Sequence, residues 1–569
     1  MLSFALSAGA QSMYDAINFS RNDYFGTARS MSLGNAVTAV GGDLGTIGIN
    51  PAGSAVSNYG QVVITPGLSI SSVNSAYSPA GESQYGAFHR TERSKFSLPN
   101  IGLSLVFDTG RSSGLKSVTF SLVSNQTAQY NYKAAVGGYN DRTSMTAELA
   151  AASYGYAEDV LGKYASYSTS SVPWDVLTAY QAGLVDLYGS NPSQYAGISE
   201  TLVYDEGLGR FVHYLPGTLA QNSVVSKTGN KKDVVLNFGM NFSDVLLFGV
   251  NIGMPSAEYR YSESFSESAL DNALFPLYDL SRNGAVYNTE FAGASKAYDY
   301  AADYDGIYAK FGVILTPFAG LRLGAAFQTP TIYDVTEQWR YTMSSHFTNP
   351  GADIRDVSSP QGEYSYNLRS PYVFNIGAAY TFGSLGFVSV DYELTDYSVM
   401  RFSEASTAGY YPQDSFYDLN ETNRNFAGAS HALRLGAELR VTPSLSLRAG
   451  FSTLTSPERH WTNDLGEDVT ADDFLADFHD YNHGTRSLVR SSYYGDRTNS
   501  VSAGFGYSSS GSFFYDFAVR LTRYPTTTFA PYYDYDNYNV DGSLANVASP
   551  RIMNKINLWS AAMTFGWRF

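Results

Sequence analysis

Apolar and polar side chains alternate with a period of two along much of the chain. At its C-terminal end, the odd positions of 559–569 are apolar and the even positions between them are small or polar. Successive side chains of a β-strand point to opposite faces, so this period predicts strands rather than helices. The pattern predicts about fourteen strands, over residues 61–71, 97–108, 117–131, 232–242, 245–257, 304–316, 320–330, 368–381, 385–395, 431–441, 445–454, 498–508, 512–523 and 555–569.

The connections between these strands are alternately short and long. The short ones are rich in Gly, Pro, Ser and Asp, which favour tight turns. The long ones cover approximately 72–96, 132–231, 258–303, 331–367, 396–430, 455–497 and 524–554. Outer-membrane barrels have short periplasmic turns and longer extracellular loops, whereas a soluble β-sandwich gives no reason for this alternation. We therefore expect an all-β membrane protein, an antiparallel transmembrane β-barrel over residues 61–569.

The composition supports this expectation. Only 15% of the residues are charged, while 46 Tyr and 34 Phe are present. A soluble surface carries more charge, and a disordered chain carries fewer aromatic residues. The net charge of −16 makes a nucleic-acid partner unexpected, because phosphates are bound by clustered Lys and Arg. The chain has no cysteine, which excludes disulfides and thiolate metal sites.

The first residues resemble the end of a secretory signal. A short apolar stretch leads to a small-residue cleavage pattern at Ala8–Ala10, so we interpret residues 1–10 as a signal-peptide remnant; an ordinary frayed terminus is the alternative. The longest apolar run, Val245–Val250, is far shorter than the roughly 20 residues that a membrane-spanning helix needs. An exported chain of this kind predicts a bacterial outer-membrane location, with both termini in the periplasm.

Residues 11–60 do not alternate. They are small and glycine-rich, with scattered apolar residues such as Leu33, Val37 and Ile47. A barrel of about fourteen strands is too wide to be filled by its own side chains, so we expect this segment to form a plug inside the lumen. A cap on the periplasmic rim is the alternative.

The N-terminal motif carries a family resemblance. Gly34 and Ala36, followed by the run Asn50, Pro51, Ala52 and Gly53, resemble the N-terminal hatch of the FadL/TodX family of outer-membrane transport proteins. The resemblance implies a fourteen-stranded barrel with the hatch inside and passive uptake of a hydrophobic small molecule or lipid, such as a long-chain fatty acid. It also implies lateral release at a kinked third strand. In this chain the most polar point of that strand is Ser124, Asn125 and Gln126.

Two further features follow from the same resemblance. The terminal Phe565, Trp567 and Phe569 resemble the signal that is recognised by the barrel assembly machinery. Relatives with this barrel also serve as accessory or shuttle proteins of type IX secretion, which bind a surface protein partner rather than a lipid. The long connection at 132–231, in which a helical stripe begins near Trp174, suits either role. An apolar pocket between hatch and wall, lined by the Ile, Leu and Val residues of 31–49, would favour transport.

The sequence offers little support for an enzyme. His460, His479 and His483 lie in the acidic connection 455–497, but Asp480 stands where the zinc-protease signature requires a glutamate. No phosphate-binding loop follows the glycines of 41–48. We expect no catalytic residues, no metal and no cofactor, and the loop is interpreted as a solvated acidic surface.

Overall fold

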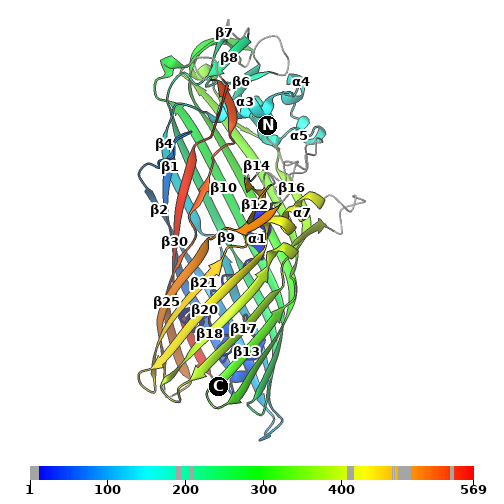
Figure 1. Ribbon diagram of the computed structural model, residues 1–569, viewed down its shortest axis with the longest axis vertical. Helices are drawn as coiled ribbons and strands as arrows, with labels where there is room; N and C mark the ends of the chain where they lie inside the picture. The colour runs from blue at the N-terminus through cyan, green and yellow to red at the C-terminus, as the bar shows by residue number, and fades with distance from the viewer. Residues whose placement is uncertain are drawn as a thin grey trace.

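The computed structural model describes residues 12–187, 194–205, 210–282, 284–405, 416–463, 466, 468–471, 489–509, 511–538 and 544–569. The predicted remnant at 1–10, together with His479 and His483, lies outside these residues. Fourteen antiparallel strands form a closed barrel (Figure 1), as the period of two predicted. Neighbouring strands follow chain order, and pairing of Val62 with Trp567 joins the last strand to the first.

Several barrel strands consist of two consecutive segments, where a proline or a short irregular turn interrupts the ladder. These pairs are β3 with β4, β13 with β14, β17 with β16, β18 with β19, and β26 with β27. The barrel segments are β1 (Gln61–Ser78), β2 (His89–Asp108), β3 (Leu115–Gln129), β4 (Tyr132–Asn140), β9 (Leu219–Phe242), β10 (Leu246–Ala269), β12 (Ala285–Phe318), β13 (Leu321–Gln328), β14 (Ile332–Phe347), β16 (Gly362–Arg369), β17 (Val373–Thr381), β18 (Gly386–Asp396), β19 (Arg401–Glu404), β20 (Ala429–Arg440), β21 (Leu445–Thr455), β25 (Arg497–Ser508), β26 (Phe513–Arg523), β27 (Thr527–Phe529) and β30 (Arg551–Arg568).

The remaining elements lie before or between the barrel strands. The short strands are β5 (Val185–Leu187), β6 (Tyr195–Gly197), β7 (Thr201–Asp205), β8 (Arg210–Tyr214), β11 (Pro276–Arg282), β15 (Ile354–Ser358), β22 (Arg459–Thr462), β23 (Asp468–Val469), β24 (Arg490–Tyr493), β28 (Tyr535–Tyr538) and β29 (Leu544–Val547). The helices are α1 (Met13–Ser20), α2 (Ala28–Ser32), α3 (Met145–Ser153), α4 (Glu158–Leu161), α5 (Ser166–Thr169), α6 (Trp174–Gln181) and α7 (Tyr417–Phe426). Five 3₁₀ turns complete the described elements: η1 (Leu44–Thr46), η2 (Pro51–Val56), η3 (Asn272–Leu274), η4 (Pro350–Ala352) and η5 (Tyr397–Val399).

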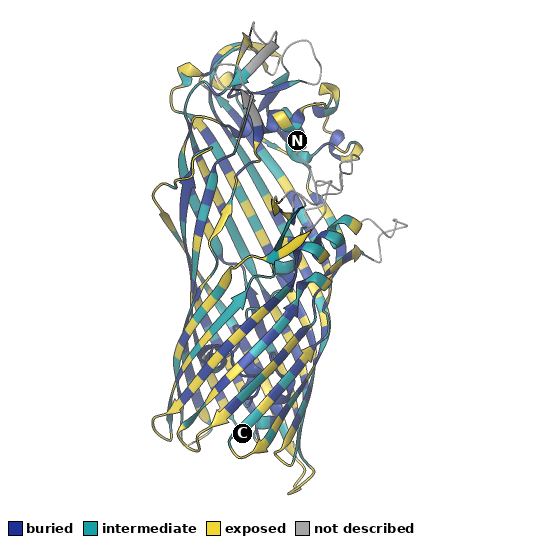
Figure 2. Cartoon of the chain, viewed as in Figure 1, coloured by how far each residue is buried: buried dark blue, intermediate teal, exposed yellow. Residues whose placement is uncertain are grey.

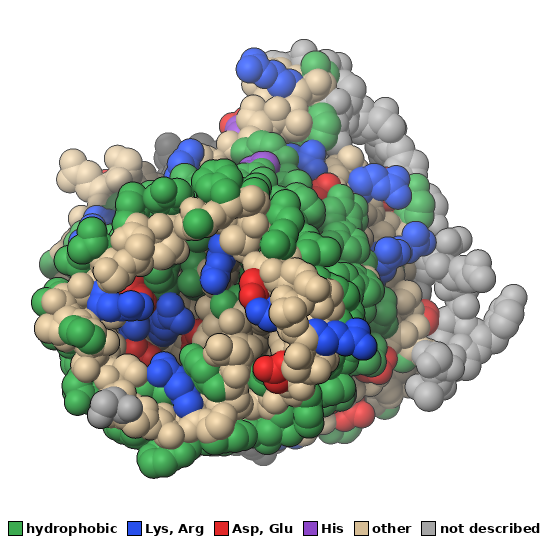
Figure 3. All heavy atoms as spheres, turned by 90° about the horizontal axis from the view of Figure 1, so that it is seen from below, with side chains coloured by type: hydrophobic (Ala, Val, Ile, Leu, Met, Phe, Trp, Pro, Cys, Tyr) green, Lys and Arg blue, Asp and Glu red, His purple; other side chains and the backbone are tan. Residues whose placement is uncertain are grey.

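Near the short turns, apolar side chains point outward and polar ones point inward. Ile64 and Trp567 are 45% and 54% exposed, while Thr564 is fully buried. Figure 2 shows the alternation of exposed and buried residues along the lower strands. Seen from below (Figure 3), hydrophobic side chains cover the outer rim and charged ones gather inside the opening. This inside-out arrangement suits a hydrocarbon environment around the barrel. Within the described residues, every helix is too short or too polar to cross a membrane.

On one side the strands continue far beyond their expected ends. Residues 219–231, 258–269 and 285–303, which the alternation left within long connections, belong to β9, β10 and β12. Above the apolar band both faces of these strands carry polar residues, so the periodicity fades although the ladder continues. Figure 1 shows these strands rising above the level at which β18, β20 and β21 end.

Helices of the long connection 141–215 cover the upper end of the tall strands (Figure 1). Leu177 and Leu184 of the predicted helical stripe are fully buried in the core of this cap. The predicted stripe consists of Leu177, Tyr180, Leu184, Leu187 and Tyr188, but α6 ends at Gln181, Leu184 follows the helix and Leu187 belongs to β5. The stripe thus packs the cap, and Tyr188 lies outside the described residues. Glu267 fixes the start of α3, since its carboxylate accepts hydrogen bonds from Ser144 Oγ and from Met145 N (3.1 Å).

Candidate functional site

The N-terminal segment, residues 12–60, passes through the lumen of the barrel. Its helices α1 and α2 and its turns η1 and η2 contact strands on several sides of the wall. Leu44 and Ile47 pack with Val63, Val123 and Val235 of the wall. Apolar side chains of the segment are thus used in contacts with the strands.

Glycines in the wall make room for this segment. The luminal glycine ring consists of Gly239, Gly249, Gly312, Gly324, Gly436 and Gly450, several of which are paired across adjacent strands. A Cβ at Gly312 would lie 2.0 Å from Asn50 Oδ1, and one at Gly249 would lie 2.3 Å from the carbonyl carbon of Pro51. Glycine allows the two backbones to approach at these points. This ring was not predicted from the sequence. The sequence pattern that indicates it is a glycine at an inward-facing position of many strands.

The hatch-motif residues lie where the segment meets this ring. Asn50 accepts a hydrogen bond from Ala52 N (3.0 Å) and donates through Nδ2 to the carbonyl oxygens of Thr38 (2.7 Å) and Val313 (3.2 Å). Pro51 begins the turn η2, and Gly53 O accepts from Gly42 N (2.8 Å). Gly34 has φ +63, and Ala36 is fully buried. The motif thus holds a tight fold of the segment against the wall; its role as a hatch stays a prediction.

Cations of the wall hold backbone carbonyls of the segment. Lys310 Nζ donates to Gly48 O (2.6 Å), and Lys231 Nζ donates to Phe19 O (3.0 Å) and Arg21 O (2.5 Å). Both lysine side chains are fully buried. On the lower side, Arg29 pairs with Glu438 (3.3 Å), which also pairs with a wall arginine (2.6 Å). A buried charge is costly unless it is paired or hydrogen-bonded, so these contacts stabilise one position of the segment.

The barrel ladder is interrupted between β2 and β3. Their pairing ends at Asn100 and Asn125; above this level the described residues of β3 and β4 pair with β9, and residues 89–97 of β2 pair with β1. We call this unpaired boundary the wall seam. Ser124 is still paired on both sides, Asn125 is the last such residue, and Gln126 is paired with β9 alone before a bulge.

The N-terminal segment contacts this interruption directly. Asp23 N donates to Thr127 O (2.7 Å), and Phe25 N donates to Gln126 O (3.0 Å). The bulge in β3 turns these carbonyl groups away from the ladder, and the segment supplies their donors. The predicted stretch 124–126 therefore lies at the seam, and the sequence reasoning missed that the segment is bonded to it. No local signal marks this pairing, because it joins residues about a hundred positions apart.

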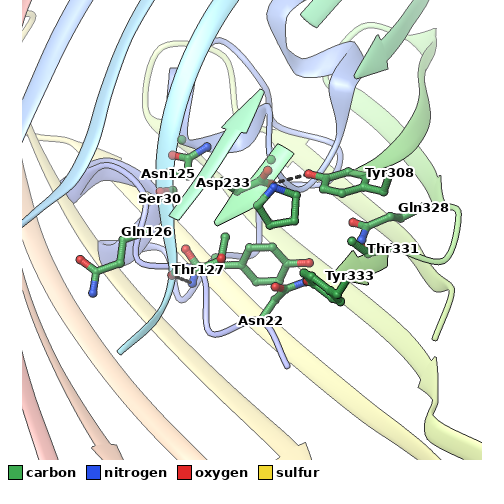
Figure 4. Close-up of a pocket in the computed structure, with 16 residues that line it drawn as sticks. Asn22, Ser30, Asn125, Gln126, Thr127, Asp233, Tyr308, Gln328, Thr331 and Tyr333 are labelled. Atoms are coloured by element: carbon green, nitrogen blue, oxygen red, sulfur yellow. Dashed lines mark hydrogen bonds between the residues drawn. The ribbon is translucent and has the colours of Figure 1, made fainter. Parts of the chain in front are cut away.

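A small polar cavity lies beside the seam. Its free volume is about 20 Å³, room for one water molecule. In Figure 4, Tyr308 donates a hydrogen bond to Asp233 on one side, and Asn125, Gln126 and Thr127 lie on the other. Within the described part of the chain, Gln126 Oε1, Thr127 Oγ1 and Asp233 Oδ1 are buried without a hydrogen-bond partner. The space beside the seam is therefore mainly polar, unlike the apolar pocket that would favour transport.

Above the cavity the lumen is lined by aromatic rings. Phe19 of α1 contacts Tyr304 (4.6 Å between ring centroids) and Tyr259 (5.9 Å), and Tyr304 contacts Tyr333 (5.4 Å) at the cavity wall. Further rings continue toward the cap. We call this set the aromatic column; its members are Phe19, Tyr130, Trp174, Tyr259, Tyr298, Tyr300, Tyr304, Tyr333, Trp339 and Tyr341.

Hydroxyl groups give the column polar contacts as well. Tyr300 and Tyr366 both donate to Glu337 Oε1, at 2.6 and 2.5 Å, and Tyr130 and Tyr304 share a hydrogen bond of 2.6 Å. A tyrosine offers both an apolar face and a polar tip. This column was not predicted from the sequence. The spacing of Tyr298, Tyr300 and Tyr304 along one face of a strand is the signal that points to it.

The other predicted sites are less developed. His460 lies 3.4 Å from Asp468, and the described residues hold no cluster of acidic and histidine side chains that would bind a metal ion. At the C-terminus, Phe569 and Gly60 exchange two backbone hydrogen bonds of 3.0 Å, and Phe565 and Trp567 face outward. Their recognition by the assembly machinery stays a prediction.

Comparison with known proteins found no matching family model and no matching curated protein. Among solved structures, a FadL homologue of Pseudomonas aeruginosa has a TM-score of 0.45 and 11% identity, over 96% of this chain and 98% of that one. The toluene transporter TodX of Pseudomonas putida gives 0.43 and 11%, over 96% and 99%. The monoaromatic hydrocarbon channel CymD gives 0.42 and 11%, over 95% and 98%. The chain is thus similar, over nearly its whole length, to solved structures of the FadL and TodX type.

Proposed function

We propose that this protein is an outer-membrane channel for a hydrophobic small molecule. The outward apolar band supports the membrane placement, and the aromatic column offers an apolar route down the lumen. Burial of apolar surface is worth about 0.8 kcal/mol per methylene group, so such a lining suffices to take up a poorly soluble compound. The proposed transport is passive and carries the hydrophobic molecule inward.

The observation that carries the proposal is the bonding of the N-terminal segment to the wall seam. Asp23 and Phe25 occupy the carbonyl groups of Thr127 and Gln126 where the ladder ends. The segment also fills the lower end of the aromatic column with Phe19. Movement of residues 19–26 would therefore clear the column and free the seam at the same time. We propose that this movement opens the channel, and that the ligand leaves laterally through the seam.

A disulfide that fixes the segment to the wall tests the proposal. The chain has no cysteine, so Asp23→Cys with Thr127→Cys is the only pair present in the variant. We expect oxidation to lower uptake of labelled oleate or toluene into cells at least tenfold, and reduction to restore it. Ala437→Cys with Ala449→Cys, which joins two paired outward positions of β20 and β21, is the control. Unchanged uptake after cross-linking, confirmed by mass spectrometry, would contradict the proposal.

A second function deserves testing because the cavity beside the seam holds only about 20 Å³. In this alternative the barrel is a sealed scaffold that binds a surface protein through its outer cap. The alternative predicts that the cross-link between positions 23 and 127 leaves uptake of labelled oleate or toluene unchanged. It also predicts that one surface protein copurifies in a stoichiometric amount. Loss of uptake in the cross-linked variant without such a partner would exclude it.

A further inference from the structure

The wall seam is lined by cationic side chains. Arg93 Nη1 donates to Ser226 Oγ (2.7 Å), and Lys95 Nζ donates to Gly229 O (2.9 Å), so both side chains reach from β2 across the seam to β9. Lys232 is exposed on the outer face of β9, opposite Gln126. Arg93, Lys95 and Lys232 are called the basic cluster. Arg93 and Lys95 thus bridge the seam through neutral acceptors rather than through ion pairs, and Lys232 lies beside it.

The charge of this cluster is largely uncompensated. None of its three members forms an ion pair within the described residues. The charged groups that act on Lys95 are two cations, Arg93 and Lys232, and one carboxylate, Glu258. Adjacent like charges repel, and an anion placed among them removes that repulsion. This local excess of positive charge contrasts with the net charge of −16 for the whole chain.

An apolar groove lies directly below the basic cluster on the outer face. It has a volume of about 450 Å³ and is formed by strands β2, β3, β9 and β10. Its lining includes Leu103, Leu105, Phe120, Leu122, Leu236 and Phe238. Leu103 pairs with Leu122, and Leu122 with Leu236, three residues below the level of Asn100 and Asn125. At about 3.3 Å per residue, the groove starts roughly 10 Å below the end of the ladder.

Groove and cluster together have the shape of a lipid site. The groove belongs to the outward apolar face, and the basic cluster lies at its upper end, on the side of the long connections. Phe96, on β2 between the groove and Lys95, is 73% exposed on the outer face, whereas Arg93 and Lys95 extend from the other face of β2 across the seam. An acyl chain in the groove would therefore place its head group among Arg93, Lys95 and Lys232. Guanidinium and ammonium groups bind phosphate through charge-assisted hydrogen bonds.

We propose that the wall seam binds a phosphate-bearing membrane lipid of the outer leaflet, with an acyl chain in the apolar groove and the phosphate on the basic cluster. The bound lipid closes the wall where the backbone ladder ends. The inference rests on the membrane placement proposed above and does not depend on transport. Because the acyl chain contributes to binding, a free phosphate ion does not replace the lipid.

Native mass spectrometry of the full chain in detergent tests the lipid site. The probes are lipid A and its dephosphorylated form, which have the same acyl chains. We expect lipid A to bind at least tenfold more tightly, because its phosphate groups are attracted to the three cations. Inorganic phosphate in excess leaves the bound lipid in place. Equal binding of the two lipids, or displacement by inorganic phosphate, would overturn the proposal. Absence of binding by both lipids would overturn it as well, whereas the uptake assay above tests transport independently.

Variants locate the site. The triple variant Arg93→Gln, Lys95→Gln, Lys232→Gln should abolish the preference for lipid A. The matched control removes three exposed arginines from strands β14, β16 and β19 on another part of the wall, by Arg340→Gln, Arg369→Gln and Arg401→Gln. This control should retain the preference for lipid A. If the triple variant fails to fold, the single variant Lys232→Gln replaces it in the test, because this exposed side chain does not cross the seam. Lys232→Gln should weaken lipid A binding several-fold. Full lipid A preference in both seam variants would refute the site.

Discussion

At the scale of single residues, adjacent positions of one strand lie in opposite environments. Lys231 is fully buried and bonds to the N-terminal segment, while Lys232 is exposed beside the seam. Their difference follows from the alternation of side chains across a strand. A buried ammonium group has to be hydrogen-bonded, so the carbonyl oxygens of Phe19 and Arg21 fix Lys231 as much as Lys231 fixes them.

Replacement of this buried lysine should release the start of the N-terminal segment. In Lys231→Met, two carbonyl groups lose a charged donor, and hydrogen bonds to charged groups are worth about 1.5–3 kcal/mol. We expect amide hydrogen exchange over residues 12–26 to become at least tenfold faster. Lys232→Met, which changes the neighbouring exposed side chain, is the control and should leave exchange unchanged. Equal exchange in the wild type and both variants would show that Lys231 does not hold the segment.

At the scale of elements, the cap is built around buried carboxyl groups. Burial raises the pKa of Glu148 on α3 from 4.5 to about 7, with Lys296 opposing and Asp175 reinforcing the shift. Burial raises the pKa of Glu267 and Glu200 as well. A carboxyl group whose pKa is higher in the folded than in the unfolded state favours folding when it is protonated. The cap is therefore expected to be most stable at low pH.

The pH dependence of α3 follows from the sign of this shift. Below pH 4.5, Glu148 is protonated in both states; between pH 4.5 and about 7, ionisation favours the unfolded state; above about 7 the loss is complete. The full difference corresponds to roughly 3 kcal/mol. Hydrogen exchange of residues 145–153, corrected for intrinsic rates, should show lower protection at pH 8 than at pH 5.

Glu148→Gln provides the control for this pH dependence. The amide stays neutral at every pH, so the loss of protection should become smaller, with a remainder due to Glu267 and Glu200. The same loss in the variant as in the wild type would assign the whole effect to other groups.

At the scale of the whole molecule, the N-terminal segment and the wall fit each other through the luminal glycine ring. The ring lets the strands approach the segment backbone, and the cations Lys231, Lys310 and Arg322 then bind its carbonyl groups. The fit is steric as much as electrostatic, because protein interiors are close-packed.

A side chain added to the ring should therefore displace the segment. In Gly312→Val the new Cβ would lie 2.0 Å from Asn50 Oδ1 and 2.8 Å from Pro51 Cδ. Overpacking of this kind costs about 1–3 kcal/mol, and we expect the segment to become sensitive to protease while the barrel stays folded. Gly495→Val is the control, since nothing lies within 4 Å of its added Cβ. Equal resistance of both variants would contradict the steric fit.

The sequence alone was sufficient for the barrel and for its strand number. In segments such as 431–441 and 555–569 one face is apolar and the other is not, and a local period of two then determines the strand, its faces and its turns. Where polar residues occur on both faces, as at 219–231, the same ladder continues with little local signal, and only the paired neighbours reveal it.

The site was decided by the tertiary structure. The bonds of Asp23 and Phe25 to Thr127 and Gln126, the aromatic column and the basic cluster each join residues from distant parts of the chain. Such contacts depend on strand register and on closure of the barrel, which place separate strands at the same height. The sequence of a single strand does not indicate which residues lie opposite it across the lumen. These contacts therefore form only when the barrel wall closes around the N-terminal segment.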